Sequence, residues 1–488
     1  MPEAASDGRS RLTITLPALL NLVVQGNRDL RDRQLQRLLE QQILAEAEAR
    51  FDPRLTPTVG VGVRQTFEAG FGGGASLPDS LGGSDTTLGD RLTLTQSAGV
   101  LGTVTTRQGT QIGLTLDVLG DTPIRLEFAQ PLLRGAGTAI NEAPVAIARL
   151  QASQNFYDLQ QTLIDTVSTT INQYTDLIQT QEAVAIQTQA LERRQQQLVI
   201  LTALVEAGRR AEFDLVDSRR SVANAERDLI LAQTRLEQAN TTLLDQVGTD
   251  ENILLVAAAD TVADLFQAAV DRIAAYEVET LLAIAYQRRP DYLQTLLSQD
   301  IATLNRDLAA DDLRWQLDVA GGANLGDLAD ATVGVVARRT FTDPALETAR
   351  VESEVTQRQA ANRLAQQQTT IRNDITTQLN TVRANLVRVE AARRATDNAR
   401  LQLEVTQELF QRGRAGGTLF QLITQEENLV EAQNQQLQAE IEFLNSTAAL
   451  DRAVGLTLAT WSRDIDFLPA LLTPPAEEPP PAATQGAD

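Results

Sequence analysis

The sequence contains two similar halves, and this duplication limits the possible folds more than any short motif does. Each half has a helical pattern, then short alternating patterns, then a very long helical pattern interrupted by glycine. Gly208 matches Gly413 at an offset of 205 residues, and Gly248 matches Gly455 at an offset of 207. The chain is therefore predicted to be an internally duplicated, mainly helical protein.

The first helical segments of the two halves align at a different offset. Leu30 falls on Tyr292 at an offset of 262, whereas the glycines after the long helices are 205 residues apart. The first half therefore holds 57 more residues between its first helix and its long helix. We expect these residues to form a glycine-rich loop, over 68–90, and extra strands.

Helical periodicity covers most of the chain, since apolar residues recur at steps of three and four. Only 4% of the residues are aromatic, a composition that favours long helices with thin cores. At a rise of 1.5 Å per residue the longest segment would measure roughly 100 Å. The helices are predicted at 12–50, 139–206, 213–246, 280–311, 347–410 and 419–453.

Short segments between the helices alternate between apolar and polar residues, which is typical of a strand with two different faces. In the first of them Leu55, Val59 and Val61 alternate with Thr58 and Gly60. Residues 111–130 are predicted as one interrupted strand or two, and residues 92–100 alternate as well. The four strands expected to have membrane-spanning length lie at about 54–67, 111–130, 313–322 and 331–341.

The two repeats and their flanking segments divide the chain. The predicted boundaries are a disordered N-terminus at 1–11, a first repeat at 12–248, a side segment at 249–279, a second repeat at 280–455, a second side segment at 456–472, and a disordered tail rich in proline and acid at 473–488.

Composition excludes several classes of function. The chain has no Cys and no His, which removes disulfides, thiolate nucleophiles and imidazole bases. A net charge of −22 excludes the basic footprint that nucleic-acid binding needs. We predict no catalytic, cofactor or metal site, and hence no enzyme. The sequence also has no run of eighteen apolar residues, and its start has no apolar segment typical of a signal peptide.

The alternating strands fit two settings equally well, a bilayer or the edge of a soluble sheet. Four strands are too few to close a barrel, for which about eight is the usual minimum. In lipid an open sheet edge would leave backbone groups unpaired, so the strands would have to close with strands of other copies.

Several segments resemble the TolC family of outer-membrane efflux ducts, over about Leu12 to Leu472. They are FDPRLTPTVGVGV after the first helix, LEFAQPLLRGAG before the long helix, RRPDY at the start of the second half, and the two GR…F…L…A…VG hairpins. The resemblance implies a homotrimer in the outer membrane of a diderm bacterium, with four strands per chain in a 12-stranded barrel. A cylinder of long helices with an equatorial belt would extend into the periplasm, and the two side segments would belong to that belt.

The resemblance also implies export of small molecules or polypeptides, as part of a tripartite efflux pump or of type I secretion. An inner-membrane pump would drive export through a periplasmic adaptor. The sequence does not choose between efflux and protein secretion. A competing interpretation is a soluble or peripheral coiled-coil scaffold in which the strands form a small capping sheet.

The resemblance places the periplasmic tips, where the adaptor docks, at the two helix-hairpin turns. The residues concerned are Gly208, Arg209, Arg210, Gly413, Arg414, Gly416 and Gly417. An equally good interpretation is that these are turn residues without a partner. Phe213 and Phe420, just after the turns, are expected to pack between hairpins.

In the family the second hairpin carries carboxylates that form a ring around the entrance. Here those positions hold Gln421 and Thr424, whereas the first hairpin has Asp214 and Asp217. We hypothesise that the two aspartates, repeated in three copies, form a constriction that attracts cations. The alternative is that they are ordinary solvated carboxylates of a helix.

The resemblance makes LEFAQPLLRGAG the joint at which a barrel strand becomes a tunnel helix. Pro131 is expected to end the hydrogen bonding of the strand, because proline has no backbone N–H. Gly135 and Gly137 are expected to let the backbone bend there.

Overall fold

The computed structural model describes residues 3–4, 10–65, 84–87, 92–117, 124–249, 253–258, 261–324, 331–339, 343–412, 418–462 and 465. The chain forms two compact units. Unit 1 comprises residues 1–36, 156–294 and 365–488, and unit 2 comprises residues 37–155 and 295–364. Of the predicted segments, most of the loop at 68–90, the turn at 413–417 and the tail at 473–488 lie outside the described residues.

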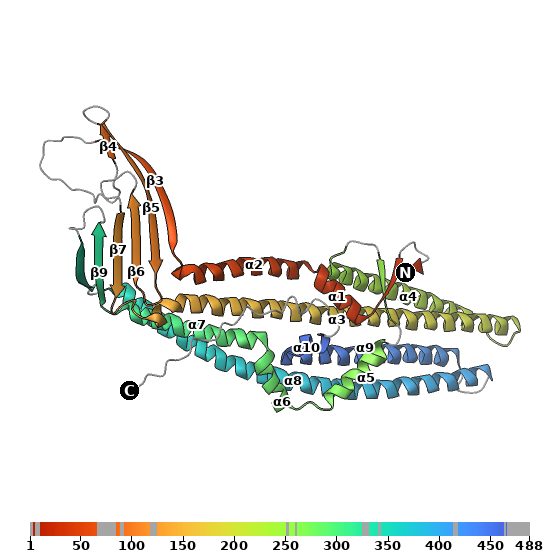
Figure 1. The fold of residues 1–488 in the computed structure, drawn as a ribbon. Coiled ribbons are helices and arrows are strands. Elements are labelled where there is room, and N and C mark those ends of the chain that lie inside the picture. The colour runs from red at the N-terminus through yellow and green to blue at the C-terminus, as the bar shows by residue number, and fades with distance from the viewer. Residues whose placement is uncertain are drawn as a thin grey trace. The chain divides into compact units, whose positions relative to one another are not determined.

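Unit 2 contains an antiparallel sheet with the strand order β10-β9-β7-β6-β5-β3 (Figure 1). A short strand, β4 (Ser84–Thr87), pairs with β5 beyond the end of β6. The six long strands are β3 (Arg54–Gln65), β5 (Leu92–Thr105), β6 (Gln111–Asp117), β7 (Ile124–Pro131), β9 (Gln316–Asn324) and β10 (Thr332–Arg338).

The prediction of four long strands per chain is wrong, since the sheet has six. The segment 111–130 forms the β6–β7 hairpin, and the alternation around residues 92–100 belongs to a full strand of the same sheet. In the hairpin Ile112 pairs with Phe128 and Leu114 with Leu126, so even-numbered residues face the same side in both strands. An alternation that keeps one phase cannot distinguish such a hairpin from one interrupted strand.

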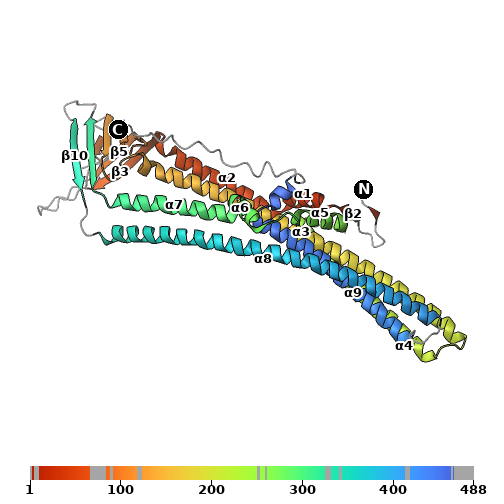
Figure 2. The ribbon, with the colours of Figure 1, turned by 90° about the horizontal axis from the view of Figure 1, so that it is seen from below.

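Unit 1 contains most of each helix hairpin. Helix α3 (Thr138–Glu206), of 69 residues, is followed by α4 (Glu212–Val247), and α8 (Pro344–Gln411), of 68 residues, is followed by α9 (Leu419–Val454). The unit 1 parts of the two hairpins run side by side (Figure 2). The other helices among the described residues are α1 (Leu16–Gly26), α2 (Arg28–Glu48), η1 (Ala49–Phe51), α5 (Thr261–Ile273), α6 (Val278–Arg288), α7 (Pro290–Asp312) and α10 (Thr457–Trp461).

The N-terminal region differs from the prediction of a disordered start followed by one helix over 12–50. Strand β2 (Ser10–Ile14) pairs antiparallel with β1 (Glu3–Ala4) and parallel with β8 (Ile253–Ala257). The helix that follows is broken at Asn27, whose side chain accepts a hydrogen bond from the N–H of Leu30 at 3.1 Å. The partner strand β8 follows the whole first helix hairpin in the sequence, so the local pattern could not reveal this pairing.

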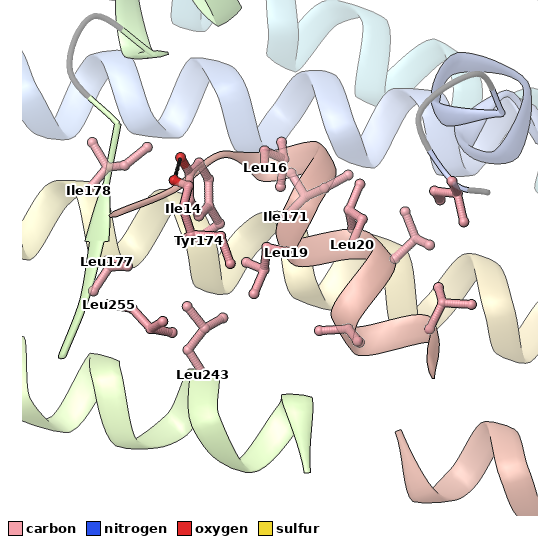
Figure 3. Packing of buried hydrophobic residues seen from close by; sticks show 14 of the residues in the cluster. Ile14, Leu16, Leu19, Leu20, Ile171, Tyr174, Leu177, Ile178, Leu243 and Leu255 are labelled. Atoms are coloured by element: carbon pink, nitrogen blue, oxygen red, sulfur yellow. Dashed lines mark hydrogen bonds between the residues drawn. The ribbon is translucent and has the colours of Figure 1, made fainter. Parts of the chain in front are cut away.

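The main core of unit 1 lies where α1 meets the long helices (Figure 3). Tyr174 of α3 is fully buried there, and its hydroxyl donates to the carbonyl oxygen of Ile14 at 3.1 Å. Leu19, Leu177 and Leu243 come from α1, α3 and α4 and are also fully buried. Three separate stretches of sequence therefore share one apolar cluster.

The end of each return helix makes a similar contact in the two halves. Helices α4 and α9 both end at a left-handed glycine, Gly248 and Gly455. A Cβ on Gly248 would lie 2.9 Å from the carbonyl oxygen of Gly26, and one on Gly455 would lie 3.1 Å from the carbonyl carbon of Arg288. The sequence offset that places Leu30 on Tyr292 also places Gly26 on Arg288. The structure thus repeats this contact at positions that the sequence offsets relate.

Within the described part of the chain, no helix combines the length and the apolarity needed to cross a membrane.

Candidate functional site

The sheet of unit 2 has one apolar face that continues across all six long strands. The pairing registers place residues of each strand on this face: Leu55, Val59 and Val61 of β3, Val100 and Val104 of β5, Ile112, Leu114 and Leu116 of β6, Ile124, Leu126 and Phe128 of β7, Leu317 and Val319 of β9, and Val333, Val335 and Ala337 of β10. In sheets with one solvated face the apolar residues normally cover a core. In this sheet the apolar residues of the six strands form one continuous surface.

The opposite face is mainly polar. One row of paired residues crosses the whole sheet, namely Arg54, Thr103, Gly113, Glu127, Gly322 and Thr332. A neighbouring row holds Thr115, Arg125 and Asn324, of which Arg125 donates to Asn324 at 3.4 Å. Leu101 and Val336 are exceptions on this face. The two faces therefore suit two different surroundings.

The apolar face is open in the chain as described. Val59 is 84% exposed, Val61 71%, Val333 75% and Val335 67%. Large contiguous apolar surfaces of this kind mark contact with a membrane or another protein. The outer strands β3 and β10 each have a single neighbour among the described strands.

The predicted joint residues come together at one end of the sheet. The N–H of Gly135 donates to a carboxylate oxygen of Asp311 at 2.7 Å. The amide of Asn141 donates to the carbonyl oxygens of Gly135 and Gly137, at 2.8 and 2.9 Å. Asp311 is 4% exposed and Asn141 9%. Sequence reasoning missed both residues, since a single Asp or Asn in a helical segment gives no signal of what it contacts.

Backbone hydrogen bonding continues past Pro131, contrary to the expectation that this proline ends it. The N–H of Leu132 donates to the carbonyl oxygen of Leu317 at 2.7 Å, and that of Arg134 to Trp315 at 3.1 Å. Proline lacks one donor, but the residues after it keep theirs. The pairing of β7 with β9 therefore extends into the joint.

The turn between β5 and β6 packs against this joint. The N–H of Gly137 donates to the carbonyl oxygen of Gln108 at 3.2 Å. Gly109 is buried, with a φ of +92°, and a Cβ there would lie 2.5 Å from the carbonyl oxygen of Gly135. The turn therefore fits only with glycine at 109.

Replacing Gly109 by alanine should destabilise the protein by roughly 3 kcal/mol or more, because backbone strain adds to a clash with backbone atoms. Gly135→Ala is the matched control, since Gly135 also has a positive φ, of +76°, but open space around its Cβ. It should cost only about 1–2 kcal/mol. Denaturant unfolding of both variants measures the difference, and equal losses would contradict the packing described here.

The first predicted tip is the turn between α3 and α4. Gly208 has a φ of +69°, and the N–H of Arg209 donates to the carbonyl oxygen of Leu204 at 2.9 Å, which closes the C-terminus of α3. The guanidinium of Arg210 lies 4.7 Å from the centre of the Phe410 ring. Arg209 is exposed.

The aspartates proposed for the constriction lie at the start of α4. Asp214 is half-buried, and Asp217 forms an ion pair with Arg220 at 3.5 Å. Phe213 and Phe420, expected to pack between hairpins, are 70% and 78% exposed, so most of each ring is open in the described chain.

In the second tip, Gly413, Arg414, Gly416 and Gly417 lie outside the described residues. Gln421 forms a capping box with Thr418. The N–H of Gln421 donates to the Thr418 hydroxyl at 3.2 Å, and its side-chain oxygen accepts from the N–H of Thr418 at 3.1 Å. The pattern T-x-x-Q is a known start signal for a helix and would have identified this role.

A buried charged cluster near the tips was not predicted. Glu426 of α9 is 2% exposed and accepts a hydrogen bond from Gln197, and its other carboxylate oxygen lies 4.0 Å from Arg194. Burial raises the pKa of Glu426 to about 7, although Arg194 and Arg193 lower it in part. Arg194 donates to the carbonyl oxygen of Ser221 at 3.0 Å. The helical pattern of the sequence shows that a glutamate stands at this position. It does not show that three helices bury the side chain.

No group of metal-ligating residues occurs among the residues that the structure describes.

Comparisons with known proteins agree with this architecture. Neither a family model nor a curated protein matches the sequence. Solved structures do match: CusC, whose structures concern transmembrane channel formation, has a TM-score of 0.65 at 14% identity and covers 93% of this chain and 95% of its own.

Two further structures are similar. The outer membrane protein VceC from Vibrio cholerae has a TM-score of 0.63 at 15% identity, covering 90% of this chain and 96% of its own. The outer membrane channel CmeC of Campylobacter jejuni has a TM-score of 0.64 at 13% identity, covering 92% and 90%. The long helix hairpins and the two-faced sheet thus give this chain the fold of these outer-membrane channels, which is the fold that the resemblance in its sequence predicts.

Proposed function

We propose that the protein is a passive channel-tunnel in the outer membrane of a diderm bacterium, formed by three copies of the chain. One observation carries the proposal: a single apolar face continues across six strands and lies open, while the opposite face is polar. Lipid would cover the first face and water the second.

The assembly follows from the number of strands. Six strands are fewer than the usual minimum of about eight for a closed barrel. In a bilayer the outer edges of β3 and β10 must find partners, because lipid offers no hydrogen bonds. Strands of identical copies supply them, and three copies agree with the trimer that the resemblance implies.

The conduit needs no catalytic group, and its energy would come from other proteins. An inner-membrane pump and a periplasmic adaptor are the proposed partners. The adaptor would dock at the hairpin tips, at Gly208, Arg209 and Arg210 and at 413–417. The exported cargo would be small molecules or polypeptides.

Extraction and reconstitution test the proposal. The protein should require detergent, run as a heat-sensitive trimer on unheated gels, and carry ionic current in planar bilayers. A protein that is extracted without detergent and gives no current would instead be the coiled-coil scaffold with a capping sheet.

Replacing Asp214 and Asp217 by asparagine should lower the cation-to-anion permeability ratio of single channels by roughly twofold or more, because three copies lose six charges at the entrance. Glu226→Gln with Glu237→Gln is the matched control, since it removes as many charges from exposed positions further along α4. A ratio that both double variants leave unchanged would show that the aspartates are ordinary helix carboxylates.

A further inference from the structure

We infer that each chain contributes six strands to the barrel, so that a trimer closes eighteen strands, with the β5–β6 hairpin forming part of the lipid-facing wall. The inference rests on the proposed membrane function. It concerns a hairpin that the second half of the chain lacks.

The lengths of the connections show the insertion. Strands β3 and β7 are separated by the long stretch 66–123, whereas β9 and β10 are separated only by the short stretch 325–331. This difference accounts for most of the excess length of the first half over the second. Without the insertion β3 and β7 would correspond to β9 and β10, giving two strands per half.

The inserted strands carry the same two faces as their neighbours. Leu114 of β6 lies between Gly102 of β5 and Leu126 of β7, and Gly102 pairs in turn with Leu55 of β3. A Cβ on Gly102 would lie 3.2 Å from the Leu55 side chain, so the two residues contact one another on this face. If the hairpin were a separate soluble cap, its apolar residues would not need to lie on the same face of the sheet as those of its neighbours.

The hairpin is also fixed at the end of the sheet where the strands join the helices. Its turn hydrogen-bonds to Gly137 through Gln108, and Gly109 packs against Gly135. At this end it is held by the joint, and along its length it is held by the continuous pairing of β5 with β6 and of β6 with β7. The hairpin is thus continuous with the wall.

Adding two strands preserves the way in which copies can join. Neighbours in the sheet are antiparallel throughout, so the first and last of six strands, β3 and β10, run in opposite directions. The β3 edge of one copy can therefore pair antiparallel with the β10 edge of the next. Each free edge of the sheet therefore pairs with another copy of this chain.

The consequence is a wider barrel. Barrel diameter grows roughly linearly with the number of strands, so eighteen strands enclose a lumen about 1.5 times as wide as twelve at the same tilt. Barrels of 16–18 strands leave an aqueous channel. The membrane part would therefore admit bulkier cargo than a 12-stranded barrel.

Quenching of tryptophan by brominated lipids tests whether the hairpin faces lipid. The chain has two tryptophans, Trp315 and Trp461, and Phe at both positions gives a dark background. Leu114→Trp on the apolar face of β6 should be quenched strongly and Thr115→Trp on the opposite face weakly. Val59→Trp in β3 reports independently whether the sheet is in the membrane.

The outcomes separate the two proposals. Quenching at 59 and 114 but not at 115 supports the eighteen-stranded wall. Quenching at 59 without quenching at 114 overturns the inference and leaves the membrane function intact. No quenching at 59 overturns both. Electron cryo-microscopy of the unmodified trimer in nanodiscs gives an independent count of strands: eighteen are expected, and twelve would refute the inference.

Discussion

Val59→Arg is expected to prevent assembly in the outer membrane. Val59 lies on the apolar face of β3 and is 84% exposed in the chain, so the membrane function places it in lipid. Arginine on the lipid face of a barrel costs about 2–4 kcal/mol at the bilayer midplane and less near its surface. Three copies multiply this cost roughly threefold per trimer. Membrane-fraction trimer on unheated gels should fall to a small part of the unmodified level.

Thr58→Arg is the matched control, because Thr58 is the adjacent residue on the polar face. Its hydroxyl makes a hydrogen bond of 3.4 Å to Gly99, which contributes little. We expect trimer at nearly the unmodified level. If both variants assemble equally well, the exposed valines face water. That result would favour the coiled-coil scaffold over the outer-membrane channel.

Arg194→Leu is expected to destabilise the helix hairpins strongly at pH 8 and much less at pH 5.5. At pH 8 Glu426 is ionised and buried, and removing the Arg194 guanidinium takes away the larger of its two favourable charge interactions, which costs up to about 3–5 kcal/mol. At pH 5.5 Glu426 is protonated, because burial raises its pKa to about 7. What is lost then is mainly packing and the bond to Ser221.

Glu426→Gln is the control, and it shows in which direction the ionisation of Glu426 changes the stability. The folded-state pKa of Glu426 lies above its ordinary value of 4.5, so its ionisation removes stability as the pH rises from about 4.5 to about 7. A neutral glutamine should therefore leave stability unchanged near pH 4.5 and raise it at pH 8, by at most about 3 kcal/mol.

Hydrogen exchange of α4 and α9 measures these effects as local opening free energies. The double variant Arg194→Leu with Glu426→Gln should lose the pH dependence of the single arginine variant. A loss of stability on Arg194→Leu that is the same at pH 5.5 and pH 8 would mean that the carboxylate and the guanidinium do not interact.

Local sequence was sufficient for the features that repeat along the chain. The long helices follow from apolar residues at steps of three and four, and their ends from Gly208, Gly248 and Gly455, which take the left-handed backbone that glycine accepts. The two-faced strands follow from simple alternation. The resemblance in segment order predicted the fold that the comparisons found.

The tertiary structure alone decided how these elements pair. Alternation in one phase cannot tell one interrupted strand from the β6–β7 hairpin, so the sequence predicted four long strands where six exist. Likewise, Asp311, Asn141 and Glu426 are ordinary polar residues of helical patterns. The partners of Asn141 are local, but the roles of Asp311 and Glu426 depend on a backbone donor and on side chains from distant segments. Only folding brings these together, because local periodicity records which face a residue occupies but not what lies against it.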